Sequence, residues 1–555
     1  MRTGIRHRTM TAAVLAVALA LAAACGGDDD DDASPEATGD QPVATSSGTD
    51  AAPGTDAAPG TDSTAATAST SGTGTPVMGG EITVIHVTDS SSLDPTSGNS
   101  GNDHMSLYPM YDRLVNFDPE TLEATPGLAT SWDQPDPQTL VLQLQDGVTF
   151  HDGTPFDAEA VKYNLERGLT LETSTEKADL AMIESVEATG PLEVKIHMNR
   201  PDASLLLILA DRPGMMVSPT AAEASGADFG RNPVGTGPFK FVEWITGDRL
   251  VVEKNPDYWQ EGKPYLDKIT IRYLTDVQTI SNALRTHEAD VALKLASSEV
   301  DTLDVDGLGI EVNPSLGVTL CYFNFSRPPF NDPQVRRAVN FAVDRDAINE
   351  ALAFGLAEPA SEIFPPGYWA ADPDLASTFT FDQDQARELM ASAGLADGVS
   401  IKGLTYTGTA QTRLMEVMQA QLAEIGIDMT VEQLDVGAAT STFFEDLGHD
   451  LYCAGWSGRP DPSQTTNSLF AADSFYNPGK YDSPGMAAAL DEASATQDHD
   501  ARAEAFSEII RLSQDDALLL PLLHSPDITA VYDDIGGFTP NLYGKVDVSF
   551  LWRES

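Results

Sequence analysis

The chain has 555 residues, of which 41% are apolar, so it is long enough for more than one domain and can bury a sizeable core. Its 85 acidic residues outnumber its 32 basic residues and give a formal net charge of −53 at pH 7. A surface this acidic repels nucleic acids and anionic lipid headgroups, so we expect no nucleic-acid partner.

The start of the chain has the features of a secretory signal peptide. Three arginines precede an apolar run at residues 11–24, which ends in small residues and is too short for a comfortable membrane span. Cys25 follows at the place where a signal peptidase would cut, and the Leu-Ala-Ala-Ala before it resembles a bacterial lipobox. We therefore expect 1–24 to be a signal peptide and Cys25 to be lipidated.

A low-complexity segment follows the cysteine. It is rich in Asp, Ala, Thr, Ser, Gly and Pro, and the hexapeptide Thr-Asp-Ala-Ala-Pro-Gly occurs twice. Nothing in this composition can build a core, so 25–78 is predicted to be a lipid anchor and disordered linker. The globular body is expected to begin at residue 79, and no later stretch approaches the roughly 18 apolar residues that a membrane helix needs.

Strand and helix patterns run through the globular body. The sequence predicts a strand at 81–87, a hairpin at 239–253, a helix with a capping box from Thr275 and a helix opened by Asp332. Further along, helices at 382–393, 411–425 and 438–447 alternate with strands at 399–405, 427–434 and 451–456. This alternation predicts βαβ units with a parallel sheet, in which ligands bind beyond the carboxyl ends of the strands. The loop after residue 456 is therefore a candidate binding site.

Motifs for catalysis are weak. The segment from Gly455 to Gly458 falls short of a nucleophile elbow, because Arg459 stands where the last glycine is needed. The glycines at 235 and 237 lead into a strand and not a helix, which indicates a turn. The nine histidines show no paired spacing typical of metal ligands. We expect no catalytic residues, no metal and no cofactor, and we expect that the protein is not an enzyme. A hydrolase is the competing possibility.

Nine short segments, in order, resemble the family 5 extracellular solute-binding proteins, which include oligopeptide-, dipeptide- and nickel-binding subunits of ABC importers. They are Leu-Asp-Pro at 93–95, Tyr-Asp-Arg-Leu-Val at 111–115, Leu-Ala-Thr-Ser-Trp at 128–132, Gly-Val-Thr-Phe-His-Asp-Gly-Thr-Pro at 147–155, Ala-Glu-Ala-Val-Lys-Tyr at 158–163, Asn-Pro-Val-Gly-Thr-Gly-Pro-Phe at 232–239, Asn-Pro-Asp-Tyr-Trp at 255–259, residues 324–340, and Gly-Trp at 455–456 followed by Asp-Pro at 461–462. The resemblance runs from about 79 to 550 and covers the globular body.

The resemblance implies an α/β fold: a two-lobed, hinged periplasmic-binding-protein fold (type II), with an extra small domain inserted in lobe one. Lobe one is expected to comprise 79–111, 226–318 and 526–555, the inserted small domain 112–225, and lobe two 319–525. The function implied is that of a substrate-binding subunit of an ABC importer, which captures a small solute between the lobes and delivers it to a membrane permease.

The expected partners are a small-molecule ligand, ABC permease subunits and the membrane, through the lipid anchor. The expected form is a monomer on the cell membrane that faces outward, into the cell envelope or periplasm. A surface ligand sensor without a transport role is the alternative.

The loop after Trp456 bears on ligand choice. Peptide-binding relatives carry an acidic residue three places after this tryptophan, where it pairs with the ligand's ammonium group, but here that place is Arg459. A guanidinium suits carboxylate or phosphate, so we expect a peptide-like or other oxygen-rich or anionic ligand. Arg459 could instead point to solvent, or Asp461 could serve as the amine partner of an oligopeptide.

The expected binding residues are therefore Trp456 as a pocket wall rather than core, together with Arg459, Asp461, Tyr322 and Asn324, the last two on the strand that enters lobe two.

Two further cysteines, Cys321 and Cys453, lie in apolar, strand-like runs. An exported protein can form a disulfide, but free cysteine is also commonly buried as a small apolar residue. We favour two buried thiols over a bridge.

The lipidation of Cys25 is open to a direct test. Replacing the acceptor thiol (Cys25→Ser) should release the protein into the medium or leave it as uncleaved precursor, because the serine cannot take a lipid. Cell fractionation and intact-protein mass spectrometry measure both outcomes. A variant that stays membrane-bound and is still cut after residue 24 would contradict the prediction.

Overall fold

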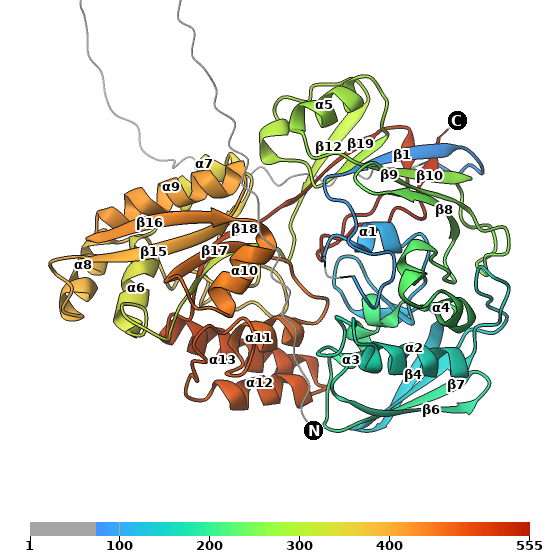
Figure 1. Ribbon diagram of the computed structural model, residues 1–555, viewed down its shortest axis with the longest axis horizontal. Coiled ribbons are helices and arrows are strands. Elements are labelled where there is room, and N and C mark those ends of the chain that lie inside the picture. The colour runs from blue at the N-terminus through green and yellow to red at the C-terminus, as the bar shows by residue number, and fades with distance from the viewer. Residues whose placement is uncertain (1–73, 99, 555) are drawn as a thin grey trace, which may run out of the picture. The chain divides into compact units, whose positions relative to one another are not determined.

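The computed structural model describes residues 74–98 and 100–554 (Figure 1). The predicted signal peptide, Cys25 and most of the predicted linker lie outside the described residues. Within them, no helix has both the length and the apolar character needed to cross a membrane.

A mixed seven-stranded sheet forms the base of lobe one. Its strands lie in the order β12 (Leu308–Asn313), β19 (Asp527–Tyr532), β11 (Val291–Leu293), β1 (Glu81–His86), β10 (Lys268–Tyr273), β9 (Arg249–Lys254) and β8 (Phe239–Ile245). The predicted first strand and the predicted hairpin correspond to β1 and to β8 paired with β9. Alternate residues of β1 enter cores on opposite faces of the sheet. Ile82 and Val84 enter the core on one face. Ile85 enters the core on the other face, where α5 (Val277–Arg285) packs.

A separate four-stranded antiparallel sheet lies within the stretch predicted as the inserted small domain. Its order is β4 (Ala129–Asp136), β5 (Thr139–Leu144), β7 (Glu193–Met198) and β6 (Ile183–Gly190), and α2 (Ala158–Thr170) packs on one face (Figure 1). Val161 and Leu165 of α2 are one helical turn apart and both enter the core of this sheet.

Two sets of side-chain hydrogen bonds between this small domain and lobe one use residues of the predicted motifs. Arg167 of α2 donates two hydrogen bonds to Asp94, at 3.0 and 2.6 Å. Asp112 accepts from the Tyr258 hydroxyl at 2.8 Å and from the Trp259 indole at 2.9 Å. These motifs therefore stabilise the architecture.

Lobe two is built on a six-stranded sheet in the order β14 (Glu358–Pro359), β18 (Leu519–His524), β13 (Val318–Phe323), β17 (Leu451–Trp456), β15 (Val399–Tyr406) and β16 (Ile427–Leu434). The prediction of parallel strands is right for β17, β15 and β16. The neighbouring β13 is antiparallel to both β17 and β18, which the local pattern did not predict.

Helices cover both faces of this sheet. The core on one face contains residues of α6 (Pro333–Ala342), α7 (Arg345–Ala353), α8 (Gln383–Ser392) and α9 (Thr409–Ala423). The core on the other contains residues of α10 (Val436–Phe444), α11 (Pro462–Phe470), α12 (Met486–Ala495) and α13 (His499–Asp515). Along β13, Cys321 faces the first core and Tyr322 the second, as the pleat requires.

Short elements complete the fold. They are α1 (His104–Leu107), α3 (Leu205–Ile208), α4 (Pro219–Ser225), the 3-10 turns η1 (Arg212–Gly214), η2 (Gly226–Arg231) and η3 (Ser297–Glu299), the pair β2 (Val115–Phe117) and β3 (Ala124–Pro126), and the pair β20 (Ile535–Gly536) and β21 (Trp552–Arg553).

Helix starts were predicted with mixed success. Asp332 caps α6 as expected, accepting from the Gln334 backbone amide at 2.8 Å. The capping box predicted from Thr275 is wrong. The cap of α5 is Asp276, one residue later, which accepts from the Thr279 amide at 2.8 Å. A carboxylate at this position caps as well as a hydroxyl does, so the helix starts after the aspartate.

Within the described residues the chain passes between the seven-stranded and six-stranded sheets twice. One passage is residues 314–317, between β12 and β13, and the other is residues 525–526, between β18 and β19. We call these the crossing segments. The Ser315 hydroxyl donates to the Ser525 carbonyl at 2.7 Å, and the Ser525 amide donates to the Gly317 carbonyl at 2.8 Å. We propose that they form the hinge. The lobe boundary predicted at 525/526 falls within one of them, and the boundary predicted at 318/319 falls just after the other, inside β13.

The preference for two free thiols in lobe two is wrong. Cys321 and Cys453 are direct cross-strand partners on β13 and β17, and their sulfur atoms are bonded at 2.01 Å. The expectation failed because two apolar strands in unknown register say nothing about which residues face each other. The antiparallel register puts the two cysteines on the same face and opposite one another.

The disulfide closes a loop with a sequence separation of 132 residues. Removing it in the double variant Cys321→Ala/Cys453→Ala should lower the free energy of unfolding of lobe two by about 2–4 kcal/mol, because the unfolded chain regains loop entropy. Urea unfolding of the variant and wild type measures the difference. Equal stability, or free thiols at 321 and 453 in unfolded, unreduced wild type, would contradict the bridge.

Candidate functional site

A small pocket of about 160 Å³ lies beside the crossing segments, and we call it the hinge pocket. Lobe one, the crossing segment at 314–317 and lobe two all contribute to its wall. The lining residues are Gly101, Asn102, Met105, Lys294, Ser315, Gly317, Ser457, Gly458, Tyr543, Gly544 and Lys545. The pocket therefore brings together parts of the chain that are more than 400 residues apart.

Lys545 is the most deeply buried charge in this wall, with 4% of its surface exposed. Its ammonium donates to the Tyr543 hydroxyl and lies 3.9 Å from the centre of that ring. Tyr543 in turn donates to Asp211 at 2.8 Å. Burial lowers the pKa of Lys545 well below its usual range, and the nearby cations Arg459, Arg212 and Lys294 act in the same direction, against Asp211.

Asp211 is the anion behind the lysine. Burial raises the pKa of this carboxyl group, but the His104 hydrogen bond and the charges of Lys545 and Arg212 outweigh burial and hold that pKa well below its usual range. His104 approaches the other carboxylate oxygen, and burial lowers the pKa of the imidazole to about 4. Asp211 is therefore charged at neutral pH, and it is not among the lining residues of the pocket.

Lys294 is the second cation of the hinge pocket. It stands directly after β11 with a positive φ of 60°. Its ammonium pairs with Asp527 at 2.9 Å. Asp527 also lies outside the pocket wall. Two ammonium groups thus face the pocket, and their counter-charges lie behind them.

A larger hollow of about 940 Å³ lies between the inserted domain and helices α11 and α12, and we call it the side cleft. Its charged lining residues are Asp179, Arg200, Asp202, Asp473 and Asp491, so acidic groups predominate. Polar contacts cross it at two points. The Gln464 amide donates to Asp179 at 3.3 Å, and the Ala203 backbone amide donates to the Ser494 carbonyl at 2.7 Å.

Arg459 is half-buried near both hollows. Burial lowers its pKa, but Tyr543 of the hinge pocket and Asp179 and Tyr476 of the side cleft help to raise it above the ordinary value. Its guanidinium donates at 3.3–3.4 Å to Ser457 and to the Gly458 carbonyl. No carboxylate of the described residues lies within 4 Å of it. Several of its N–H donors are therefore not engaged by an acid.

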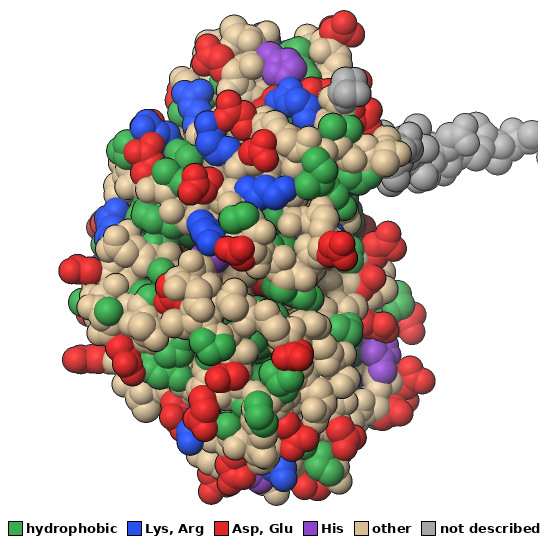
Figure 2. Space-filling model, turned by 90° about the vertical axis from the view of Figure 1, so that its right-hand side faces the viewer, with side chains coloured by type: hydrophobic (Ala, Val, Ile, Leu, Met, Phe, Trp, Pro, Cys, Tyr) green, Lys and Arg blue, Asp and Glu red, His purple; other side chains and the backbone are tan. Residues whose placement is uncertain are grey.

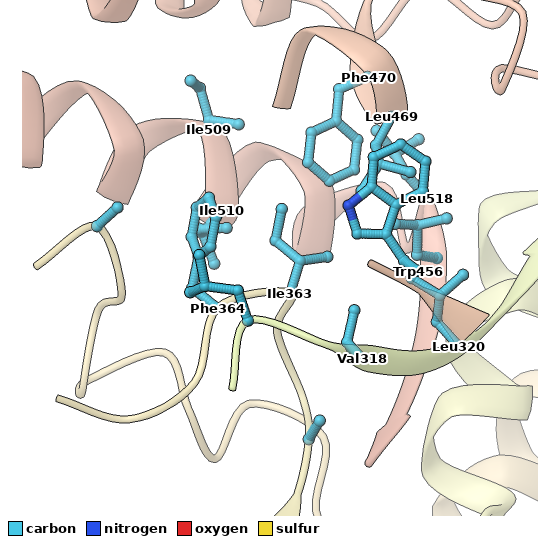
Figure 3. Packing of buried hydrophobic residues seen from close by; sticks show 14 of the residues in the cluster. Val318, Leu320, Ile363, Phe364, Trp456, Leu469, Phe470, Ile509, Ile510 and Leu518 are labelled. Carbon is cyan, nitrogen blue, oxygen red and sulfur yellow. The ribbon is translucent and has the colours of Figure 1, made fainter. Parts of the chain in front are cut away.

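Trp456 does not form the expected pocket wall. It is the last residue of β17 and is 7% exposed. Figure 3 shows its indole packed beside Leu469 and Leu518 inside lobe two. Exposure was expected from a loop position, but the strand extends through residue 456 and its pleat directs this side chain into the core. The guanidinium of Arg459 lies over the indole ring of Trp456, 5.6 Å from the ring centre.

Asp461 is fully buried, and its carboxylate is already paired. Arg502 of α13 donates to both of its oxygens, at 2.8 and 3.1 Å, and the Ser463 amide donates to it at 2.9 Å as α11 begins. An ammonium group of a ligand would have to displace a buried guanidinium. This geometry argues against Asp461 as the amine partner.

Tyr322 and Asn324 also lie in the interior of lobe two. Tyr322 is stacked on Tyr452 with ring centres 6.1 Å apart. Asn324 donates to the carbonyls of Leu447 and His449 at 3.2 and 2.8 Å, which fixes the turn before β17. Of the residues predicted to bind ligand, the structure thus places Arg459 beside residues of the hinge pocket without making it part of the wall, and it places the other four in the core.

Sequence reasoning missed the residues of the hinge pocket. Lys294 interrupts the apolar run Val-Ala-Leu-Lys-Leu-Ala, which is an unusual place for one of only 32 basic residues in such an acidic chain. A lysine inside an apolar run could therefore have marked this position as a candidate functional residue. No comparable signal marks Lys545, because its pocket exists only after the C-terminal stretch packs against lobe one.

The outer surface contrasts with the pocket. Figure 2 shows acidic side chains spread over one face of the molecule, with basic side chains gathered toward its upper part. Some exposed basic groups pair with acids, as Arg249 of β9 does with Glu243 at 2.8 Å. Positive charge facing a buried pocket is therefore a local feature of the molecule.

Two sheets joined by crossing segments, with hollows lined from both lobes, define a solute-binding protein of the type II periplasmic class. Residues 123–477 match the model of the bacterial extracellular solute-binding proteins, family 5 Middle. This chain belongs to that family, whose relatives are substrate-binding proteins of ABC importers.

Curated relatives and solved structures agree with this assignment. The glutathione-binding protein GsiB of Pectobacterium atrosepticum is 31% identical over 439 residues, which is 76% of this chain and 85% of that protein. GsiB of Salmonella typhimurium is 28% identical over 477 residues, covering 83% and 93% of the two chains. The periplasmic binding protein DppA from Helicobacter pylori, solved with a peptide, has a TM-score of 0.78 at 27% identity and covers 86% of this chain and 99% of its own.

The placement of Asp461 leads to a prediction about stability. Removing this carboxylate (Asp461→Ala) leaves Arg502 buried without its counter-charge and should lower the free energy of unfolding by about 3–5 kcal/mol. Asp384→Ala is the matched control. Asp384 pairs with Arg387, but 94% of its side chain is exposed, so its loss should have little effect. Urea unfolding measures both variants. Full stability in Asp461→Ala would contradict the structural role.

Proposed function

We propose that this protein is the substrate-binding subunit of an ABC importer and that it captures a small oxygen-rich or anionic solute in the cleft between its lobes. The observation that carries the proposal is Arg459. It donates to Ser457 and Gly458, which line the hinge pocket, and no carboxylate of the described residues engages its guanidinium donors. A guanidinium in this state suits a carboxylate or another oxygen acceptor of a ligand.

The proposal extends to the parts of the function that rest on the sequence and on family membership. We infer that Cys25 anchors the protein by lipid on the outer side of the cell membrane and that the linker holds the globular body away from the bilayer. We further infer that the protein acts as a monomer, passes its solute to permease subunits and catalyses no reaction. Curated relatives named glutathione-binding proteins make an anionic tripeptide a reasonable first candidate.

Oligopeptide binding with Asp461 as the amine partner is the less favoured alternative, because Arg502 holds that carboxylate. A surface sensor without a transport role would share the same binding chemistry. Uptake distinguishes the two functions, since deleting the gene should abolish accumulation of the solute in a transporter and leave it unchanged for a sensor.

The solute itself can be identified from the purified protein. Small molecules that co-purify and are released by denaturation should include one compound in stoichiometric amount. Mass spectrometry gives its composition, and calorimetry with the authentic compound gives its affinity. Release of no solute, together with normal uptake by the deletion strain, would contradict the transport function.

The role of Arg459 can be tested with the compound so identified. Arg459→Ala should weaken binding roughly 30-fold or more, because losing a desolvated, charged hydrogen-bond partner costs about 2–5 kcal/mol. Arg413→Ala, at an exposed position on α9, is the matched control and should bind like wild type. Calorimetry compares the three proteins. Unchanged affinity in Arg459→Ala would show that the arginine does not contact the solute.

A further inference from the structure

The hinge pocket has a chemistry more specific than the cleft as a whole. We propose that it is a subsite for one oxyanion of the solute, a carboxylate or a phosphoryl group, held by Lys294 and Lys545 with a hydroxyl donor from Ser457. This inference rests on the proposed function and narrows it, because it requires the solute to carry at least one such group.

Charge is the first support. Among the described residues that line the pocket, Lys294 and Lys545 are charged and none is acidic. Lys294 has its counter-charge in Asp527, and Lys545 reaches Asp211 only through the Tyr543 hydroxyl. Each ammonium has three N–H donors, so both retain donors beyond these contacts. Burial disfavours the charged form of Lys545, which has no carboxylate of its own, and an anion bound beside it would stabilise that form.

Glycines supply the space in front of the ammonium groups. A Cβ atom at Gly101 would lie 3.3 Å from the Ser457 hydroxyl and 4.0 Å from the Lys545 ammonium. A Cβ atom at Gly544 would lie 3.2 Å from the Lys294 ammonium. Any larger residue at either place would project toward the cations. Glycine at these positions keeps open the space that an oxyanion would occupy.

Size and location define what the pocket can hold. Its volume of about 160 Å³ is smaller than the roughly 300–1,000 Å³ typical of whole-ligand sites, so it accepts one functional group of a solute. Ser315 and Gly317 belong to a crossing segment and Ser457 to lobe two. An oxyanion bound there would contact both lobes at the hinge and would favour the arrangement in which these walls are close together.

Three variants test the subsite. Lys294→Met removes one cation, and because it also leaves the buried Asp527 without its partner, urea unfolding is measured to show that the variant is folded under the titration conditions. Gly101→Val leaves both lysines in place and fills the space before them. Lys402→Met, at an exposed position on β15, is the control. The full chain is freed of co-purified solute by unfolding and refolding, and inorganic phosphate and acetate are titrated as probes at constant ionic strength.

We expect saturable binding of at least one probe to the wild type at a single site. Lys294→Met and Gly101→Val should each weaken it about tenfold or more, and Lys402→Met should not change it. Preference for phosphate or acetate distinguishes a phosphoryl from a carboxylate group. Absence of saturable binding in wild type, or equal binding by all variants, would overturn the subsite. If Lys294→Met and Gly101→Val keep the co-purified solute at wild-type stoichiometry, the subsite fails while the transport function stands.

Discussion

Two short crossing segments connect the sheets of the described chain, and the function depends on them. Residues 314–317 and 525–526 are bound to each other through Ser315, Gly317 and Ser525. Each sheet has cores built mainly from its own lobe, although Leu122 and Tyr543 also enter a core of lobe two. A ligand that contacts both lobes can select one arrangement of them.

The proposed selectivity of the cleft rests on electrostatics. The chain is strongly acidic, with a net charge of −53, and would repel anions at long range, although salt screens this repulsion over about 10 Å. Lys294, Lys545 and Arg459 place positive charge where water is scarce and charge interactions are strong. The side cleft, with its aspartates, has the opposite character. An anionic group would thus gain little at the outer surface and much beside the hinge.

The sequence predicted the fold well where the signal was local or came from family motifs. The β15, β16 and β17 strands and the cap at Asp332 follow from hydrophobic period and capping chemistry. Predictions that depended on tertiary register failed. The disulfide could not be inferred because the pairing of β13 with β17 joins segments 132 residues apart. Trp456 and Asp461 were assigned to the cleft from their place after a strand, but the pleat and Arg502 direct them inward.

The hinge pocket could not be predicted from local sequence either. Its walls come from five separate stretches of the chain, and no window of sequence contains more than a few of its residues. The small family motifs, by contrast, turned out to join lobe one to the inserted domain, as Asp94 and Asp112 do. Motif positions identified the family, whereas the side chains that face the hollows lie mainly outside the motifs.

We propose that a solute held between the lobes draws them together about the crossing segments. Small-angle X-ray scattering of the full chain, with and without the co-purified solute, tests this closure most directly. We expect a smaller radius of gyration when the solute is bound at one-to-one stoichiometry. An unchanged radius of gyration at saturation would contradict closure of the lobes around the solute.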